Sequence, residues 1–191
     1  MPFTFKERDR ADENARLFFI KTRDFRSYSL PERINPKGRE CENEGRMIDP
    51  FVLEYNGEYR LFFKQNGVSV SRSDDLKNWE YMGRADGGEN ACVIEDGERF
   101  VLLHSPKNGI GVKESRDLIT WVDKGVYTLD QEKWDFASGR LTAAFTMPCE
   151  TDAKHRHVVF FHGSRADSVP ETHGAASLAY AYTDDFKNYY F

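Results

Sequence analysis

A seven-residue phrase recurs four times along this chain, and it constrains the fold more than any other feature. The phrase consists of a small or polar residue, any residue, Asp, Phe or Leu, two further residues and an aromatic residue. Each copy follows a short run of residues typical of a β-strand. The copies occupy residues 22–28, 73–79, 115–121 and 183–189. Internal repetition of this kind predicts several similar structural units built one after another.

A second pattern, two apolar runs around a tight turn, precedes the middle copies. It occupies residues 51–63, where the turn is Asn-Gly, and residues 92–104, where the turn is Asp-Gly. Both dipeptides tolerate positive φ at the two turn positions, so each predicts a β-hairpin. A looser version, with a polar loop between its two runs, occupies residues 141–162.

One unit therefore contains four strands: an inner strand, a second strand, a third strand and an outer strand that begins at the repeated aromatic residue. The repeat measures 42 residues from Asp75 to Asp117. A four-stranded unit of this length is typical of a β-propeller blade, whose sheet must be covered by its neighbours. We therefore expect an all-β fold, a β-propeller with about three and a half blades. The expected blades are residues 1–35 (partial), 45–84, 87–126 and 138–191, within one domain, truncated or not, over residues 1–191.

The repeated phrase itself indicates structural roles. We expect each Asp to accept hydrogen bonds from the backbone of its own turn. We expect each aromatic residue to pack between blades. The Asp residues are Asp24, Asp75, Asp117 and Asp185, and the aromatic residues are Tyr28, Trp79, Trp121 and Tyr189.

Composition excludes several classes of function. The net charge is −5, which gives no basic surface for nucleic acid or for anionic membranes. No apolar run approaches the roughly 20 residues that span a bilayer, and the N-terminus shows no signal region, so we expect a cytoplasmic protein. Cys41, Cys92 and Cys149 are odd in number and widely spaced, which indicates reduced thiols. No spacing of His, Asp or Glu matches a familiar metal motif, and we expect no cofactor.

Residues 15–191 resemble the five-bladed β-propeller glycosidases, above all glycoside hydrolase family 43 and its invertase-like relatives. Met47-Ile48-Asp49-Pro50 is similar to the Asp-Pro signature that opens a blade in that family. Glu89-Asn90, at the opening of the next blade, is similar to the position of its catalytic Glu. The motif Ser-x-Asp-Leu-x-x-Trp resembles its usual blade ending. The resemblance implies a carbohydrate substrate. Some relatives have a calcium ion near the channel axis, but no motif in this sequence supports one.

Asp49 and Glu89 both precede the first strand of a blade. Because the innermost strands of a propeller surround the central channel, their starts meet at one mouth, and we expect the two carboxyl groups to converge. Glycoside hydrolysis uses such a pair. The resemblance implies that Glu89 is the general acid and that Asp49 tunes its pKa and positions it. The alternatives are that Asp49 is a turn residue before Pro50 and that Glu89 is a solvated loop acid.

The sequence departs from the family in two respects. Family members carry an Asp base on the first strand of the first blade, whereas Asp9 and Asp12 lie in a different context, so no base is identified. Three and a half blades also cannot close a five-bladed ring. A fragment, two chains that complete each other in a homo-oligomer, or a short inactive relative would each account for this.

Further residues are candidates for substrate binding. His104 and His162 end second strands, Arg165 follows His162 closely, and Trp134 and Arg140 lie in or beside a long loop before the third inner strand. Each has a structural alternative, such as anchoring or plugging a loop. His155 and His157 flank Arg156 in an expected hairpin turn, and we expect both to be solvated.

Three hypotheses follow for function. The first is a glycoside hydrolase of the family 43 type that cleaves arabinosyl or xylosyl linkages with acid assistance from Glu89. The second is a catalytically inactive or vestigial propeller that binds carbohydrate. The third is a scaffold that presents the channel mouth to another protein.

Overall fold

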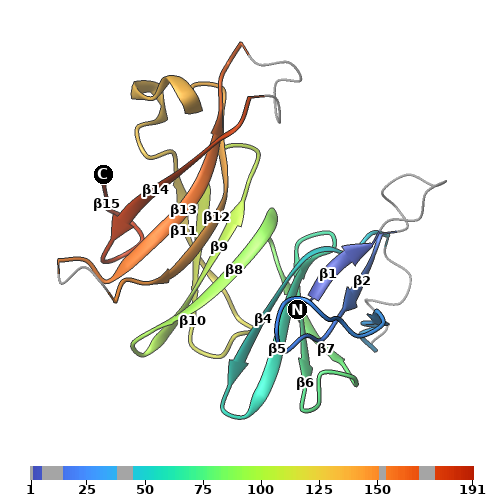
Figure 1. Cartoon of the computed structure of the whole chain (residues 1–191). Coiled ribbons are helices and arrows are strands. Elements are labelled where there is room, and N and C mark those ends of the chain that lie inside the picture. Colours follow the sequence, from blue (N-terminus) through green and yellow to red (C-terminus); the bar gives the residue numbers. More distant parts are fainter. Residues whose placement is uncertain (1, 6–14, 38–44, 151–153, 168–174) are drawn as a thin grey trace. The chain divides into compact units, whose positions relative to one another are not determined.

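The computed structural model describes residues 2–5, 15–37, 45–150, 154–167 and 175–191 (Figure 1). Within these ranges the regular elements are β-strands and two short 3-10 turns, and no α-helix occurs. None of the described segments forms a helix that is long and apolar enough to cross a membrane. The chain divides into two compact units, residues 1–91 and 92–191, and each is described by itself.

The first unit contains two antiparallel sheets. A three-stranded sheet has the order β1-β2-β3, and a four-stranded sheet has the order β4-β5-β6-β7. The strands of the smaller sheet are β1 (Pro2–Phe5), β2 (Arg16–Phe19) and β3 (Glu32–Arg33). Those of the larger sheet are β4 (Ile48–Tyr55), β5 (Glu58–Lys64), β6 (Val68–Ser73) and β7 (Glu80–Ala85).

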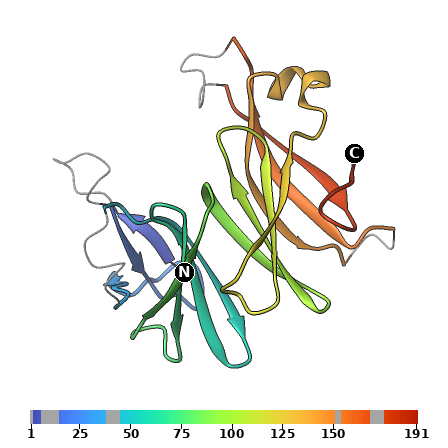
Figure 2. The ribbon, with the colours of Figure 1, turned by 180° about the vertical axis from the view of Figure 1, so that it is seen from behind.

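The second unit is built from two four-stranded sheets, each a meander of strands in chain order (Figure 2). One consists of β8 (Glu89–Asp96), whose first residues belong to the first unit, β9 (Arg99–Ser105), β10 (Ile110–Ser115) and β11 (Val122–Tyr127). The other consists of β12 (Arg140–Pro148), β13 (His157–Ser164), β14 (Ser177–Thr183) and β15 (Tyr189–Tyr190). The 3-10 turns η2 (Gln131–Lys133) and η3 (Asp135–Ala137) connect the two sheets. The predicted four-stranded unit is confirmed three times.

The two predicted hairpins differ in where the turn falls: at the Asn-Gly dipeptide in the first hairpin, and one residue after the start of the Asp-Gly dipeptide in the second. Between β4 and β5 the turn residues are Asn56 and Gly57, both at positive φ (53° and 75°), as the sequence predicts. Between β8 and β9 the turn residues are Gly97 and Glu98, and only Gly97, at 66°, has positive φ. Glycine at the first of two turn positions is typical of a type II′ turn. Asp96 is therefore the last residue of β8 and not a turn residue, which corrects the sequence-based expectation.

The repeated Asp residues fold their own turns, as predicted. The Asp75 carboxylate accepts hydrogen bonds from the backbone N–H groups of Lys77 and Asn78, both at 2.8 Å. The other three copies make the same pair of bonds to the second and third residues that follow. The apolar residue after each Asp has a positive φ between 55° and 63°. Partial burial alone would raise the pKa of Asp117, but hydrogen bonds from Thr120, Ile119 and Ser115 outweigh it and lower the pKa to about 2.

The repeated aromatic residues differ more than their sequence positions suggest. Trp79 is buried in the core of the first unit, and Tyr189 lies 6.0 Å from Tyr127 of the preceding sheet, both as expected of side chains packed between blades. Tyr28 is 52% exposed, so the expectation is wrong for this copy. Trp79, Tyr28 and Tyr189 share another role, since each donates a hydrogen bond to the backbone carbonyl three residues earlier. The aromatic residue thus closes its own turn.

The core of the first unit joins its two sheets. Seven buried side chains pack together there, from β2, β5 and the connecting segments. They are Leu17, Phe19, Ile34, Met47, Leu61, Phe63 and Trp79. Backbone hydrogen bonds of 2.9 Å from Ile34 to Leu17 and from Met47 to Ala15 hold the connecting segments against β2.

The core of the second unit includes Cys92 on β8 and Thr146 on β12, whose backbone N–H donates to Sγ at 3.5 Å. Burial raises the pKa of the Cys92 thiol to about 11. Cys92 and Cys149 are free thiols, as predicted, and Cys41 lies outside the described residues.

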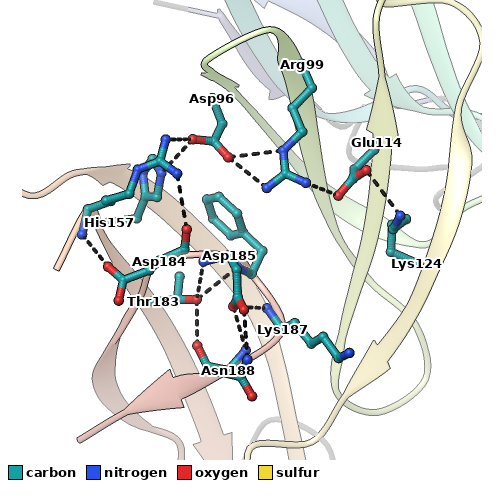
Figure 3. Close-up of polar contacts among 12 residues, drawn as sticks. Asp96, Arg99, Glu114, Lys124, His157, Thr183, Asp184, Asp185, Lys187 and Asn188 are labelled. Carbon is teal, nitrogen blue, oxygen red and sulfur yellow. Dashed lines mark hydrogen bonds and ion pairs between the residues drawn. The ribbon is translucent and has the colours of Figure 1, made fainter.

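A buried carboxylate holds the two sheets of the second unit together. The Asp96 side chain is 1% exposed and is paired with Arg99, with Arg156 and with the ring of His157. Arg99 also pairs with Glu114, which in turn pairs with Lys124 (Figure 3). Because its partners come from both sheets, Asp96 crosslinks them.

The expectation that His155 and His157 are solvated is wrong. The His157 ring is buried, bonded to Asp96 and packed 4.7 Å from Phe186. His155 pairs with Asp184 and stacks on Tyr182 and Tyr190. Arg156 also bonds to Asp184 through its backbone N–H. The segment is therefore part of the packing between sheets.

Candidate functional site

The first residues of β4 form a β-bulge that determines where the Asp49 side chain lies. The pairing of β4 with β5 shifts between Ile48 and Phe51, so that Asp49 and Pro50 lie opposite the single residue Phe63. Asp49 has a left-handed φ of 53°. Asp tolerates this conformation better than most residues, and such strained positions are often found at functional sites. The Asp-Pro signature is thus a bulge at the edge of a sheet.

The same backbone feature recurs at the start of the next two inner strands. Asn90 in β8 has φ of 55°, and Ala143 in β12, beside a register shift between Thr142 and Phe145, has φ of 56°. Asn90 is therefore the counterpart of Asp49, and Glu89 lies one residue earlier. Asp49 and Glu89 were expected to occupy the same position in consecutive units. In the structure Glu89 lies one residue before the position that matches Asp49.

Asp49 nevertheless reaches the strand that carries Glu89. Its Oδ2 atom accepts a hydrogen bond of 3.2 Å from the backbone N–H of Asn90. The bond crosses from the inner strand of one sheet to the inner strand of the next, within the first unit. The structure thus brings Asp49 beside the residue that follows Glu89.

Glu89 pairs with a residue that the sequence analysis missed. Arg46 Nη2 lies 2.7 Å from Glu89 Oε1, and the two side chains are 35% and 38% exposed. Lys64, at the end of β5, donates a hydrogen bond of 2.9 Å to the backbone carbonyl of Gly87, two residues before Glu89. Arg46 lies only three residues before Asp49 in the sequence, and this proximity was the signal available there.

The arrangement has a clear chemical capacity. Two carboxylates lie on neighbouring strands, one held by a backbone N–H and the other by a guanidinium group, and both remain accessible to solvent in part. An ion pair this exposed contributes little to stability, so it can exchange for a ligand at small cost. Such a site can orient hydroxyl groups and transfer a proton.

The other predicted site residues belong to the second unit. His104 is buried on β9, with its ring against Gly111, where an added Cβ would lie 2.2 Å from it. Arg140 and Thr142 lie at the start of β12, and Arg140 Nε and Thr142 Oγ1 are buried without a hydrogen-bond partner in the described part of the chain. His162 on β13 is the register partner of Thr142. Arg140, Thr142 and His162 therefore form one group at the opening of the third inner strand.

Trp134 and Arg165 make contacts typical of loop anchors. The Trp134 ring lies 4.7 Å from Phe191 and 6.2 Å from Phe136, and its Nε1 donates to the Leu129 carbonyl. Arg165 forms two hydrogen bonds of 2.9 Å with Asp167. It also pairs with Asp135 at 3.3 Å. Their assignment to substrate binding stays a prediction.

The remaining expectations concern the catalytic base and metal ions. Asp9 and Asp12, the acids nearest the expected position of a base, lie outside the described residues. Among the described residues no group of three His, Cys, Asp or Glu side chains could hold a metal ion. A central calcium ion therefore gains no support from them.

Comparisons with known proteins find similar structures but no similar sequence. No family model and no curated protein matches the sequence. The chain is similar to an exo-1,5-α-L-arabinanase from a bovine ruminal metagenomic library, with 14% identity and a TM-score of 0.65 over 98% of this chain and 72% of that one. It is also similar to a fructofuranosidase from Schwanniomyces occidentalis complexed with fructosylnystose, with 13% identity and a TM-score of 0.67 over 93% and 39% of the two chains.

A third match comes from the family 130 mannoside phosphorylases, a family containing glycoside hydrolases that target β-1,2 mannosidic linkages in Candida mannan. It has 15% identity and a TM-score of 0.63 over 89% of this chain and 58% of that one. The chain covers 55% and 54% of two further matches, and so spans about half their length. Together with the repeated four-stranded sheets, these similarities establish the fold of this chain as a β-propeller of the type found in five-bladed glycosidases.

Proposed function

We propose that this chain carries the acidic site of a glycoside hydrolase of the family 43 type that cleaves arabinosyl or xylosyl linkages. The observation that carries the proposal is the hydrogen bond from the Asn90 N–H to Asp49, which keeps two carboxyl groups on adjacent inner strands of the first unit. Supporting it, the fold is shared with enzymes whose names include an arabinanase and a fructofuranosidase.

Glu89 acts as the general acid in this proposal, and Asp49 acts as a positioning residue. A general acid must be protonated when it meets the glycosidic oxygen, whereas Arg46 pairs with the ionised carboxylate. The sugar therefore has to displace the Arg46 guanidinium group, which then contacts sugar hydroxyls or the departing group. A partly exposed pair permits this exchange.

Sugar hydroxyl groups also suit the group at the start of β12. Arg140 Nε and Thr142 Oγ1 are polar atoms that are buried and lack protein partners in the described segments. Buried polar atoms normally have hydrogen-bond partners, and those without one often serve a functional role. Within the second unit, taken by itself, Arg140 and Thr142 are proposed to contact carbohydrate.

Hydrolysis of aryl arabinosides, xylosides, fructosides and mannosides by the purified chain tests the proposal. Cleavage of an arabinoside or a xyloside is expected, with a loss of about 10²–10⁴-fold in kcat for Glu89→Gln. Glu95→Gln, an exposed acid on the same strand, is the matched control and should leave the rate unchanged. Full activity of both Glu89→Gln and Asp49→Asn would contradict the assignment of the site.

A second candidate function is carbohydrate binding without turnover. The Arg46–Glu89 pair favours it, because a carboxyl group bonded to a guanidinium group is not free to contact a glycosidic oxygen. Titration calorimetry with arabino- and xylo-oligosaccharides distinguishes the two. Binding that is accompanied by no hydrolysis and is unchanged in Glu89→Gln would support the binding protein and not the enzyme.

A further inference from the structure

Arg140, the first residue of β12, differs from every other half-buried arginine in the described part of the chain. Its guanidinium group forms no hydrogen bond and no ion pair there, and its Nε atom is buried. Each of the others bonds to a carboxylate, carbonyl or hydroxyl oxygen. They are Arg16, Arg46, Arg60, Arg72, Arg84 and Arg99.

A second polar atom on the same face of β12 also lacks a partner. The Thr142 side chain is buried, and its Oγ1 atom forms no hydrogen bond within the residues that the structure describes. Alternate residues of a strand share a face, and residues 140–142 pair regularly with 162–164 of β13, so Arg140 and Thr142 are neighbours about 7 Å apart along the strand. Two such groups side by side indicate a ligand that supplies both partners.

The residues opposite on β13 keep this face polar. Ser164 is the register partner of Arg140, and His162 is that of Thr142. None of the four is an acid, so an anionic group placed among them meets no like charge from them. Arg140 is only half-buried, which lets a ligand reach its guanidinium group.

The charge of Arg140 decides the chemistry of that ligand. A neutral hydroxyl group can accept a hydrogen bond from Nε, but it leaves a partly desolvated positive charge without a counter-charge. A carboxylate supplies both, because its two oxygens match the fork of N–H donors on a guanidinium group. A phosphate group carries close to two negative charges at neutral pH, which exceeds the one permanent positive charge among these four residues.

We propose that Arg140 and Thr142 bind a uronic acid unit of an oligosaccharide. Arg140 pairs with the carboxylate, and Thr142 Oγ1 hydrogen-bonds to a hydroxyl group of the same sugar unit. The inference rests on the proposed contact of these two residues with carbohydrate and narrows it to acidic oligosaccharides. It does not depend on the role of Glu89.

Titration calorimetry of the complete chain tests the preference for a carboxylate. The probes are the methyl glycosides of glucuronic and galacturonic acid and those of their neutral counterparts, glucose and galactose. At least one uronide should bind about tenfold more tightly than its counterpart, because hydrogen bonds between charged groups are the stronger ones. Equal affinities within both pairs, no binding of any probe, or tighter binding of inorganic phosphate than of either uronide would overturn the proposal.

Two arginine variants locate the preference. Arg140→Met removes the charge and keeps the length of the side chain, so it should abolish the preference for the uronide and leave binding of the neutral glycoside unchanged. Arg116→Met, which replaces an exposed arginine of the same unit, is the matched control and should retain the preference. A preference that survives Arg140→Met would contradict the assignment.

A pair of threonine variants gives a measurement that does not depend on the choice of sugar. Thr142→Val removes a buried hydroxyl group without a protein partner, so the midpoint of urea unfolding should shift upward while uronide affinity falls. Thr146→Val, on the same strand, removes a hydroxyl group that donates to the Val158 carbonyl at 3.1 Å, so the midpoint should shift downward with uronide affinity retained. Equal downward shifts would show that Thr142 is not held for a ligand.

The proposed hydrolase and this inference can fail separately. A chain that hydrolyses no glycoside and still prefers the uronide would exclude the hydrolase and leave the inference intact. Hydrolysis that Glu89→Gln abolishes, together with equal binding of uronides and neutral glycosides, would overturn the inference alone.

Discussion

Strand β8 begins with Glu89 and ends with Asp96, and the two acids show how differently one strand can use a carboxylate. Both are paired with arginine. Within the described part of the chain Glu89 forms an ion pair with Arg46, and its side chain is 38% exposed. Asp96 is 1% exposed and has two arginines and a histidine around it (Figure 3). A buried charge must have its partners, whereas an exposed pair can separate at small cost. Asp96 is therefore fixed among its partners, whereas the Arg46–Glu89 pair can open.

The largest expected effect is a difference in stability between variants of the two acids. Asp96→Asn leaves two arginines without their shared anion and should lower the free energy of unfolding by about 3 kcal/mol. Glu89→Gln should lower it by less than about 1 kcal/mol. Urea unfolding of both variants measures the difference. Equal losses of unfolding free energy in the two variants would show that burial does not distinguish the two acids.

Acid should destabilise the second unit when it protonates Asp96. Burial raises the pKa of Asp96, but hydrogen bonds from Arg99 and His157 and the charges of Arg156 and Arg99 outweigh it, so the pKa is lowered. The stability that Asp96 contributes is therefore full above the unfolded-state pKa of about 3.9 and is lost as pH falls through the lower folded value. Unfolding free energies measured between pH 6 and pH 3 should fall more steeply for the unmodified chain than for Asp96→Asn. Parallel curves would show that Asp96 is not the titrating group.

The two arginines allow a matched test, because Arg46 is 35% exposed and Arg99 is 33% exposed. Arg99→Met removes a charged donor from a buried acid and should cost about 2 kcal/mol. Arg46→Met should cost less than about 0.5 kcal/mol. Thermal unfolding of the two variants decides whether the loss of stability depends on the exposure of the arginine or on the burial of its acid.

The smallest effect concerns the backbone at the start of the inner strands. Ala143 adopts the left-handed φ of 56° without a side chain that favours it. Ala143→Gly should therefore raise the free energy of unfolding by about 0.5 kcal/mol, since relief of strain exceeds the added chain entropy. Asn90→Gly should be close to neutral, because Asn tolerates this conformation. A loss of stability in Ala143→Gly would show that the bulge is not strained.

The sequence predicted the fold well because repeats and turns are local signals. The Asp of each repeated turn and the Asn56-Gly57 hairpin were recognisable from a few adjacent residues. Asp96-Gly97 carried a similar signal, yet its turn lies one residue later, because burial of the Asp96 carboxylate among partners from a distant strand decides the register. No local pattern contains that information.

The candidate site was predicted in part for the same reason. Asp49 and Glu89 were predicted to precede inner strands, whereas the structure places them within the first residues of β4 and β8, with Asp49 bonded to the N–H of Asn90. Their catalytic roles stay a prediction. The offset of one residue between them, the pairing of Arg46 with Glu89 and the burial of His157 depend on bulges and on contacts between distant segments. Arg46 could have been suspected from charge balance, whereas the role of Asn90 required the backbone conformation.

The bulges have a consequence for how such a protein changes over generations. At two of them the N–H of the left-handed residue is bonded to a side chain from the preceding sheet, that of Asn90 to Asp49 and that of Ala143 to Ser105. The main chain supplies the donor in both cases, so the identity of the residue at the bulge is left unconstrained by that bond. A codon change that adds or removes a reactive group there leaves this main-chain bond in place.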